Sequence, residues 1–111
     1  MDNANRRIAL VSPQVISDKN QVRKAQPPLG MAYLAAVLEE NGYAGNVLCI
    51  DAVVEGYDTI VELNDDPNFV QYGLETENIV RRLENFDPDL IGITSLFSSM
   101  TECAFSVANG L

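Results

Sequence analysis

Four hydroxyl side chains near the C-terminus of this 111-residue chain are the groups best suited to bind a polar ligand. Thr94, Ser95, Ser98 and Ser99 come within a few residues after the apolar run Leu90–Ile93. Hydroxyls donate and accept hydrogen bonds, so this cluster can bind a ribose, a phosphate or a ring nitrogen. Hydrogen bonding within a turn and a helix cap is the structural alternative.

The chain lacks the residues that many catalytic and metal sites need. It contains no histidine, which removes imidazole metal ligands and histidine acid–base catalysis. Cys49 and Cys103 stand far apart in apolar stretches, so we expect two buried thiols in a reducing compartment. These absences leave no histidine or paired-cysteine site for catalysis or for metal binding.

Charge and hydropathy argue against two classes of partner. The net charge is -9, from 7 Lys and Arg against 16 Asp and Glu, and this balance repels nucleic-acid phosphates and anionic membranes. No apolar run approaches the roughly 18 to 20 residues of a membrane span, and the polar N-terminus is unlike a signal peptide. We expect a cytoplasmic protein that binds neither nucleic acid nor membranes.

Apolar periodicity predicts strands and helices in alternation. The expected strands are Ile8–Val11, Asn46–Ala52 and Leu90–Ile93, and the expected helices are Gln26–Tyr43, Thr76–Phe86 with Thr76 as N-cap, and one from about Met100. This order is typical of an α/β fold with a three-layer, Rossmann-like or flavodoxin-like parallel sheet. We expect one domain over residues 1–111, in which the sheet stops after its third strand–helix unit.

The same topology predicts where a ligand would bind. Right-handed crossovers in flavodoxin-like order make the first and third strands neighbours, and a crevice opens between their carboxyl ends. The residues expected there are Ser12, Pro13 and Gln14 on one side, and Thr94, Ser95 and Leu96 on the other. Gly30, in the first turn of the first helix, indicates either close helix–sheet packing or close approach of a ligand. Ser99 and Glu102 have the spacing of a capping box for the third helix.

Two long irregular stretches are expected near this crevice. Residues 14–26 are polar and carry more than a third of the basic side chains, so they form either a solvated connector or a loop over a negatively charged ligand. Residues 53–74 make an unusually long connection, with a short helix at 57–63. Their apolar side chains either pack beneath the loop or form a lid over a large, flat ligand.

The common phosphate-binding motifs are absent. No G-x-G-x-x-G follows the first strand and no G-x-x-x-x-G-K-[ST] occurs, so dinucleotide and nucleoside triphosphate binding lose their main support. Asp51 ends the second strand, where a Rossmann domain has its ribose-binding acid, but the glycines that accompany this acid are missing. Ser12 and Thr94 stand where a phosphoacceptor receiver domain would need acidic residues.

Several segments in combination resemble a known family. PPLGMAYLAAVLEENGY covers the first helix, NVLCIDA the second strand, YGL the end of the long connection and FDPDLIGITSL the third strand. From about Arg7 to Leu111, the chain resembles the N-terminal cobalamin-binding domain of B12-dependent radical S-adenosylmethionine (SAM) enzymes. Thr94-Ser95-Leu96 takes the place of the S-x-L motif of the broader corrinoid-binding fold. The D-x-H-x-x-G motif of that fold is missing, and its G-G segment would lie beyond Leu111.

The resemblance implies a bound cobalamin with no histidine beneath its cobalt. The nucleotide tail would enter between the first and third strands and the corrin ring would rest above the two long stretches. The site residues would be Ser12, Pro13, Gln14, Gly30, Thr94, Ser95, Leu96, Ser98 and Ser99. An iron–sulfur cluster and SAM would belong to a radical SAM catalytic domain outside this chain, which would itself be a binding module for methyl transfer or related radical chemistry.

Two rival functions stay open, and one consequence for assembly follows. The rivals are a cofactor-free flavodoxin-like regulatory or interaction domain, and an enzyme domain that binds another nucleotide-tailed ligand. Without a fourth and fifth strand, the third strand would be an exposed apolar edge. We expect the isolated chain to oligomerise, to exchange elements, or to need a partner such as the catalytic domain over this strand.

Overall fold

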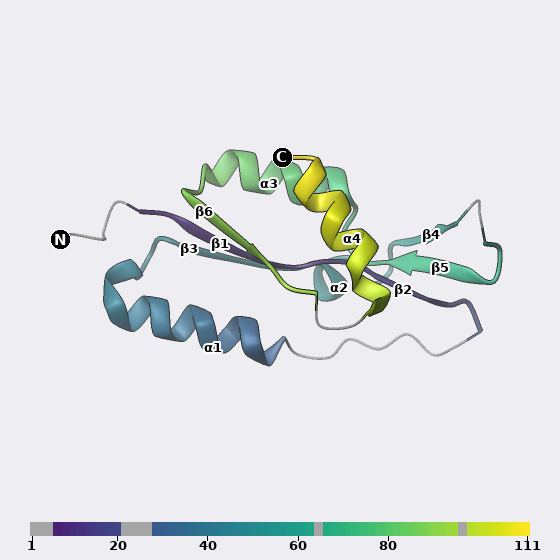
Figure 1. Cartoon of the computed structure of the whole chain (residues 1–111), viewed down its shortest axis with the longest axis horizontal. Helices are drawn as coiled ribbons and strands as arrows, with labels where there is room; N and C mark the ends of the chain where they lie inside the picture. The colour runs from purple at the N-terminus through teal and green to yellow at the C-terminus, as the bar shows by residue number, and fades with distance from the viewer. Residues whose placement is uncertain (1–5, 21–27, 64–65, 96–97) are drawn as a thin grey trace.

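The computed structural model describes residues 6–20, 28–63, 66–95 and 98–111, apart from the side chains of Ser98 and Ser99. Its elements in chain order are β1 (Ile8–Ser12), β2 (Val15–Asp18), α1 (Leu29–Leu38), the π-helical turn η1 (Glu39–Tyr43), β3 (Val47–Asp51), α2 (Ala52–Glu55), β4 (Ile60–Glu62), β5 (Phe69–Tyr72), α3 (Thr76–Phe86), β6 (Leu90–Ile93) and α4 (Ser98–Asn109). They form a parallel and an antiparallel sheet, connected where β1 leads into β2 (Figure 1).

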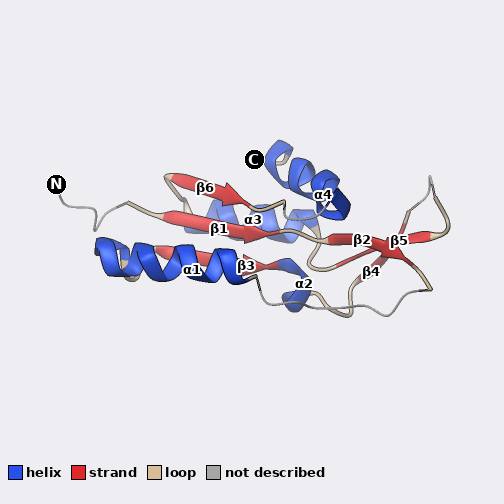
Figure 2. Ribbon diagram, turned by 60° about the horizontal axis from the view of Figure 1, so that its bottom comes forward, coloured by secondary structure: helices blue, strands red, loops and turns tan. Residues whose placement is uncertain are grey.

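The parallel sheet has three strands in the order β3-β1-β6. In the central strand β1, Ser12 pairs with Asp51 of β3 and Val11 pairs with Ile93 of β6. Helix α1 lies over one face of this sheet, and α3 and α4 lie over the other, which gives three layers (Figure 2). The predicted α/β fold class is confirmed, and so is the prediction that the first and third parallel strands are neighbours.

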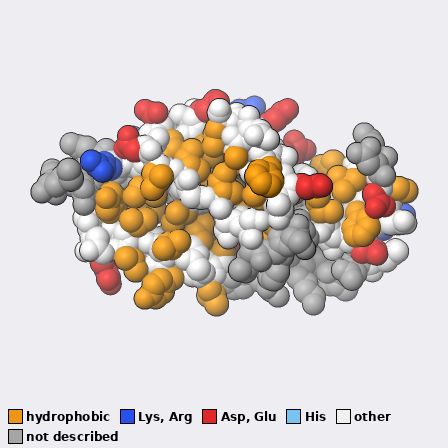
Figure 3. Space-filling view, viewed as in Figure 1, with side chains coloured by type: hydrophobic (Ala, Val, Ile, Leu, Met, Phe, Trp, Pro, Cys, Tyr) orange, Lys and Arg blue, Asp and Glu red, His pale blue; other side chains and the backbone are white. Residues whose placement is uncertain are grey.

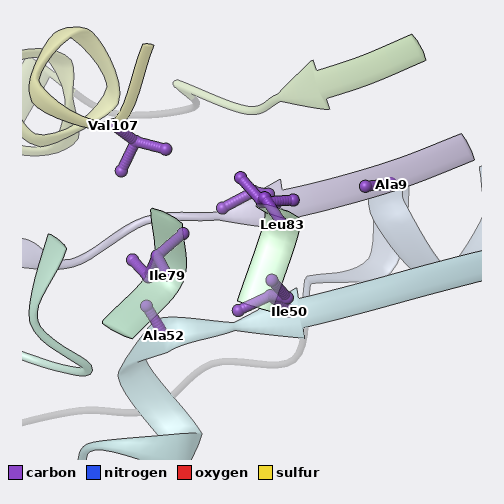
Figure 4. Close-up of a cluster of buried hydrophobic side chains, with 7 residues drawn as sticks. Ala9, Ile50, Ala52, Ile79, Leu83 and Val107 are labelled. Carbon is purple, nitrogen blue, oxygen red and sulfur yellow. The ribbon is translucent and has the colours of Figure 1, made fainter. Parts of the chain in front are cut away.

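The two faces of the parallel sheet are filled differently. The face toward α3 and α4 carries the hydrophobic core (Figure 4), which consists of Ala9, Val11, Ile50, Ala52, Ile79, Leu83 and Val107. On the opposite face no residue of α1 is buried. Strand β6 is an edge of this sheet, and Leu90 at its start is 62% exposed.

A second, antiparallel sheet takes up much of the two stretches expected to be irregular. Its order is β2-β5-β4, and Tyr72 of β5 pairs with Val15 on one side and Ile60 on the other. The prediction of an irregular polar stretch over residues 14–26 is therefore wrong for Val15–Asp18, which form β2. Residues 21–27 lie outside the described ranges. The helix expected at 57–63 is also wrong, because that segment contains β4.

Helix ends agree with the sequence only where local signals fix them. Helix α3 has the predicted bounds and ends at Asp87, which adopts a left-handed conformation with φ 54°. Its N-cap is Glu75 rather than Thr76, and Glu75 makes no capping side-chain hydrogen bond. The first helix continues from α1 through η1 to Tyr43, its predicted end, and its backbone leaves helical geometry at Asn41 and at Gly42, which has φ 99°. Helix α4 starts slightly before the expected Met100, at Ser98.

The two thiols lie in different environments. Cys103 is buried, as expected, but Cys49 is exposed, because β3 is an edge of the parallel sheet. In the part of the chain that the structure describes, no group of three or more His, Cys, Asp or Glu side chains could hold a metal ion. None of the described helices is long and apolar enough to cross a membrane.

Candidate ligand-binding pocket

A pocket of about 850 Å³ lies on the α1 face of the parallel sheet, at the carboxyl ends of its strands. Residues of the parallel strands, of α1 and of the second sheet all contribute to it. Its lining consists of Leu10, Val11, Ser12, Val15, Pro28, Leu29, Gly30, Met31, Tyr33, Leu34, Asp51, Val53, Tyr72, Gly92, Ile93, Thr94 and Met100. Ligands of open α/β sheets bind at this edge, so the pocket is the candidate functional site.

A row of three polar side chains crosses this mostly apolar pocket. Asp51, Ser12 and Thr94 lie at the carboxyl ends of the three neighbouring strands, β3, β1 and β6. Ser12 pairs directly with Asp51, and the backbone N–H of Thr94 donates to the carbonyl oxygen of Val11 at 2.9 Å. The parallel register therefore brings a carboxylate and two hydroxyls to one level of the pocket.

Two glycines line the pocket. A Cβ atom on Gly92 would come within 3.1 Å of Leu10 Cδ2, so this glycine accommodates the side chain of Leu10. A Cβ atom on Gly30 would meet nothing within 4 Å. Close helix–sheet packing therefore does not explain Gly30. It lines the pocket instead, as the alternative interpretation requires.

Asp51 is the one carboxylate among the pocket residues that the structure describes. Burial raises the pKa of its carboxyl above the usual value, and the charge of Glu55 raises it further, whereas hydrogen bonds from the backbone N–H groups of Val54 and Val53 lower it. Its Oδ1 accepts from the N–H of Val54 at 3.4 Å as the N-cap of α2. Glu55 is itself held by an ion pair with Arg82.

Three of the predicted site residues, Ser12, Gly30 and Thr94, line the pocket. Pro13 and Gln14 are buried but not among the lining residues. They occupy the short joint between β1 and β2.

Ser95 is exposed, and its hydroxyl lies 3.1 Å from that of Thr101 in α4, outside the pocket lining. Leu96 lies outside the described residues, as do the side chains of Ser98 and Ser99, so the capping-box prediction stays untested. Of the two hydroxyl side chains of this cluster that the structure describes, Thr94 lines the pocket and Ser95 does not.

The predicted site left out several residues that the structure brings into the pocket. Asp51 occupies the same place on β3 as Ser12 does on β1, so the rule that ligands bind at strand ends could have included it. Val15 and Tyr72 enter the pocket from β2 and β5. No local signal indicated that these two distant segments pair with each other.

Comparison with known proteins found relatives among methyltransferases. The chain is 34% identical over 96 residues to cytidylyl-2-hydroxyethylphosphonate methyltransferase of Streptomyces wedmorensis, covering 86% of this chain and 18% of that protein. It is 33% identical over 103 residues to an uncharacterized methyltransferase of Pyrococcus horikoshii, covering 92% of this chain and 18% of that protein. No family model and no solved structure matches. The chain thus spans about a fifth of the curated relatives it matches, and over most of its length it is similar to a segment of methyltransferases.

Proposed function

We propose that this chain is the cobalamin-binding module of a B12-dependent radical SAM methyltransferase, and that its pocket takes the nucleotide tail of the cofactor. The observation that carries the proposal is the pocket of about 850 Å³ at the carboxyl ends of β3, β1 and β6. The similarity to methyltransferases supports the reaction class. The resemblance of Pro27–Gly30 and Pro88–Ile93 to the cobalamin-binding family supports the cofactor.

The lining fits the chemistry of such a tail. A flat aromatic base needs apolar walls, which Leu10, Val15 and Met31 provide, while sugar and phosphate oxygens need hydrogen-bond donors, which Ser12 and Thr94 provide. The volume lies within the ~300–1,000 Å³ range of small-molecule sites. The corrin ring holds the cobalt itself, so the proposal needs no protein ligand to the metal.

The second sheet extends the same lining toward the outside. Directly paired residues of antiparallel strands lie on the same face of a sheet, so Ile60 shares a face with Tyr72 and Val15, both of which line the pocket. Ile60 is 49% exposed and would provide an apolar surface for the corrin ring. When bound, cobalamin supplies a cobalt-carried methyl group, and the role of these residues is to bind and orient the cofactor.

Titration of the 111-residue chain with hydroxocobalamin, followed by its visible spectrum, tests the proposal. We expect binding, and we expect Thr94→Leu to weaken it about tenfold or more, because this change removes a hydroxyl and places a larger side chain in the pocket. Ser95→Leu is the matched control. It makes the same kind of change one residue away, at an exposed side chain outside the pocket lining, and it should leave binding unchanged.

Circular dichroism of each protein shows that it is folded before its titration is interpreted. A folded wild-type chain that shows no binding at high micromolar concentration would contradict the cobalamin proposal and leave the cofactor-free domain or another nucleotide-tailed ligand. Equal affinities of the wild type and Thr94→Leu would contradict the site.

A further inference from the structure

The carboxylate in the pocket has no role in the proposal above. We propose that Asp51 selects the ligand by accepting a hydrogen bond from a neutral donor group, either a sugar hydroxyl or a primary amide. Its charge keeps the anionic part of the same ligand away from the β3 side of the pocket. This inference rests on the proposed function and adds to it the chemistry of the group that faces Asp51.

The position of Asp51 carries the first step. Asp51 pairs with Ser12 across β3 and β1, and both side chains line the pocket at the same level of the sheet. Asp51 lines the pocket and is half-buried, so its carboxyl has limited contact with water. A ligand that fills the pocket displaces more of the water around this carboxyl. A hydrogen-bond donor on the ligand must then replace the hydrogen bonds that the water made.

The unused hydrogen-bonding capacity of Asp51 carries the second step. Oδ1 accepts a rather long hydrogen bond of 3.4 Å from the N–H of Val54, and the N–H of Val53 also donates to this carboxyl. An ionised carboxylate can accept about four hydrogen bonds, so capacity remains for a ligand donor. Burial is the main cause that raises its pKa, and a donor on the ligand would favour the charged form again.

A purely structural role as helix cap is the alternative, and it explains less. Helix α2 has only 4 residues, and Ser, Thr or Asn at its N-cap would serve about as well as Asp. A helix cap does not need a charge, and burial and the charge of Glu55 both disfavour the charged form of Asp51. An uncharged capping residue would avoid this cost. Binding of a ligand donor accounts for both the charge and its place in the pocket.

Charge then orients the ligand. Ser12 and Thr94, at the ends of β1 and β6, are uncharged, whereas Asp51 at the end of β3 repels an anion. A phosphate in the pocket is therefore expected on the β6 side, near Thr94, with the neutral donor group toward β3.

Two substitutions and two ligands test the inference. Asp51→Ser keeps an N-cap side chain but shortens it and removes the carboxylate, and we expect it to weaken hydroxocobalamin binding about tenfold or more. Asp51→Asn keeps the shape of the side chain and a hydrogen-bond acceptor but removes the charge. Its loss of affinity for hydroxocobalamin should therefore be smaller, about threefold to tenfold. Glu84→Gln removes one negative charge from an exposed position on α3 and should change nothing.

Dicyanocobinamide, which lacks the nucleotide tail, distinguishes the two donor groups. If Asp51→Ser weakens only hydroxocobalamin, the donor is a hydroxyl of the tail; if it weakens both ligands, the donor is an amide of the corrin. Unchanged affinity of Asp51→Asn and Asp51→Ser for both ligands would overturn the inference while the proposed function stands. If the folded wild type binds neither ligand, the proposed function fails and this inference falls with it.

Discussion

Gln14 shows how a residue expected at the ligand crevice can have a structural role instead. It is fully buried in the joint between β1 and β2. Its Nε2 donates a hydrogen bond of 3.0 Å to Oγ1 of Thr76, at the start of α3, while its Oε1 has no partner among the described residues. The side chain therefore connects the joint between the two sheets to α3 rather than reaching the pocket.

Removing the Thr76 hydroxyl should lower stability more than removing the Gln14 amide. Thr76→Val keeps the shape of the side chain but leaves the buried amide of Gln14 without its partner, so it should lower the free energy of unfolding by about 1–3 kcal/mol. Gln14→Met removes the whole amide, and the half-buried hydroxyl of Thr76 can turn to water, so the loss should stay below about 1 kcal/mol. Urea unfolding of the two variants and of the double variant measures the difference. A larger loss for Gln14→Met than for Thr76→Val would contradict this role.

Residue type was enough to find part of the pocket because strand ends are set locally. Ser12 and Thr94 directly end or follow apolar runs, and the parallel register brings both to the pocket. Asp51 has the same position, but an acid at this place in a Rossmann domain accompanies a glycine motif, and this chain lacks that motif. The pocket uses the strand end without that motif.

Helix α1 explains why a pocket exists on its side of the sheet. All 10 residues from Leu29 to Leu38 are uncharged and mostly apolar, yet none of them is buried. Helices that are apolar on all sides are usually buried. Here Leu29 and Tyr33 line the pocket and are still 75% and 73% exposed, so the helix is packed loosely against the sheet and the gap beneath it forms the pocket.

Gly30→Ala should have opposite effects on stability and on binding. Alanine is favoured over glycine by up to about 1 kcal/mol within a helix, and the added Cβ meets no atom within 4 Å, so the free energy of unfolding should rise. The same methyl group takes up ligand space, so hydroxocobalamin binding should weaken severalfold. Thermal unfolding and titration of one preparation measure both effects.

Ala36→Gly provides the control for this helix. Ala36 is exposed and outside the pocket lining, so the change should lower stability by up to about 1 kcal/mol and leave binding unchanged. Unchanged binding by Gly30→Ala would show that the ligand does not approach the first turn of α1.

The elements that could be predicted from the sequence are those with local signals. Helix α3 has an apolar stripe and a sharp end at Asp87, and its predicted bounds are confirmed. The strands β2, β4 and β5 have only 3 or 4 residues each. Their alternation is too short to be recognised, and they are stabilised by pairing between distant segments, as between Val15 and Tyr72. The contribution of Val15 and Tyr72 to the pocket could therefore not be predicted from the sequence.

The whole molecule is elongated because the two sheets follow one another instead of stacking. Its extents are 52 × 24 × 21 Å and its radius of gyration is 14.8 Å, somewhat above the ~13 Å typical of a compact domain of about 100 residues. Large apolar side chains remain exposed over several elements, and Figure 3 shows many of them on one face. Contiguous apolar surface of this kind usually contacts another protein surface.

The free edge of β6 is the place where we expect such a contact. Among the described strands, β6 pairs only with β1, so the N–H and C=O groups on its other side are available to another strand. Leu90 at its start is 62% exposed. We expect the isolated chain to self-associate at micromolar concentrations, and we expect Leu90→Lys to shift it toward the monomer, because a lysine on an edge strand opposes strand pairing.

Sedimentation velocity of the wild type, Leu90→Lys and Tyr33→Lys shows which surface carries the self-association. Tyr33→Lys places the same charge on the exposed side of α1, where Tyr33 is 73% exposed, and should leave association unchanged if β6 carries it. A shift toward the monomer with Tyr33→Lys but not with Leu90→Lys would assign the contact to α1 instead. A wild-type chain that sediments as a sharp monomer and melts cooperatively would contradict self-association, because the apolar edge of β6 would then be tolerated in water without a partner.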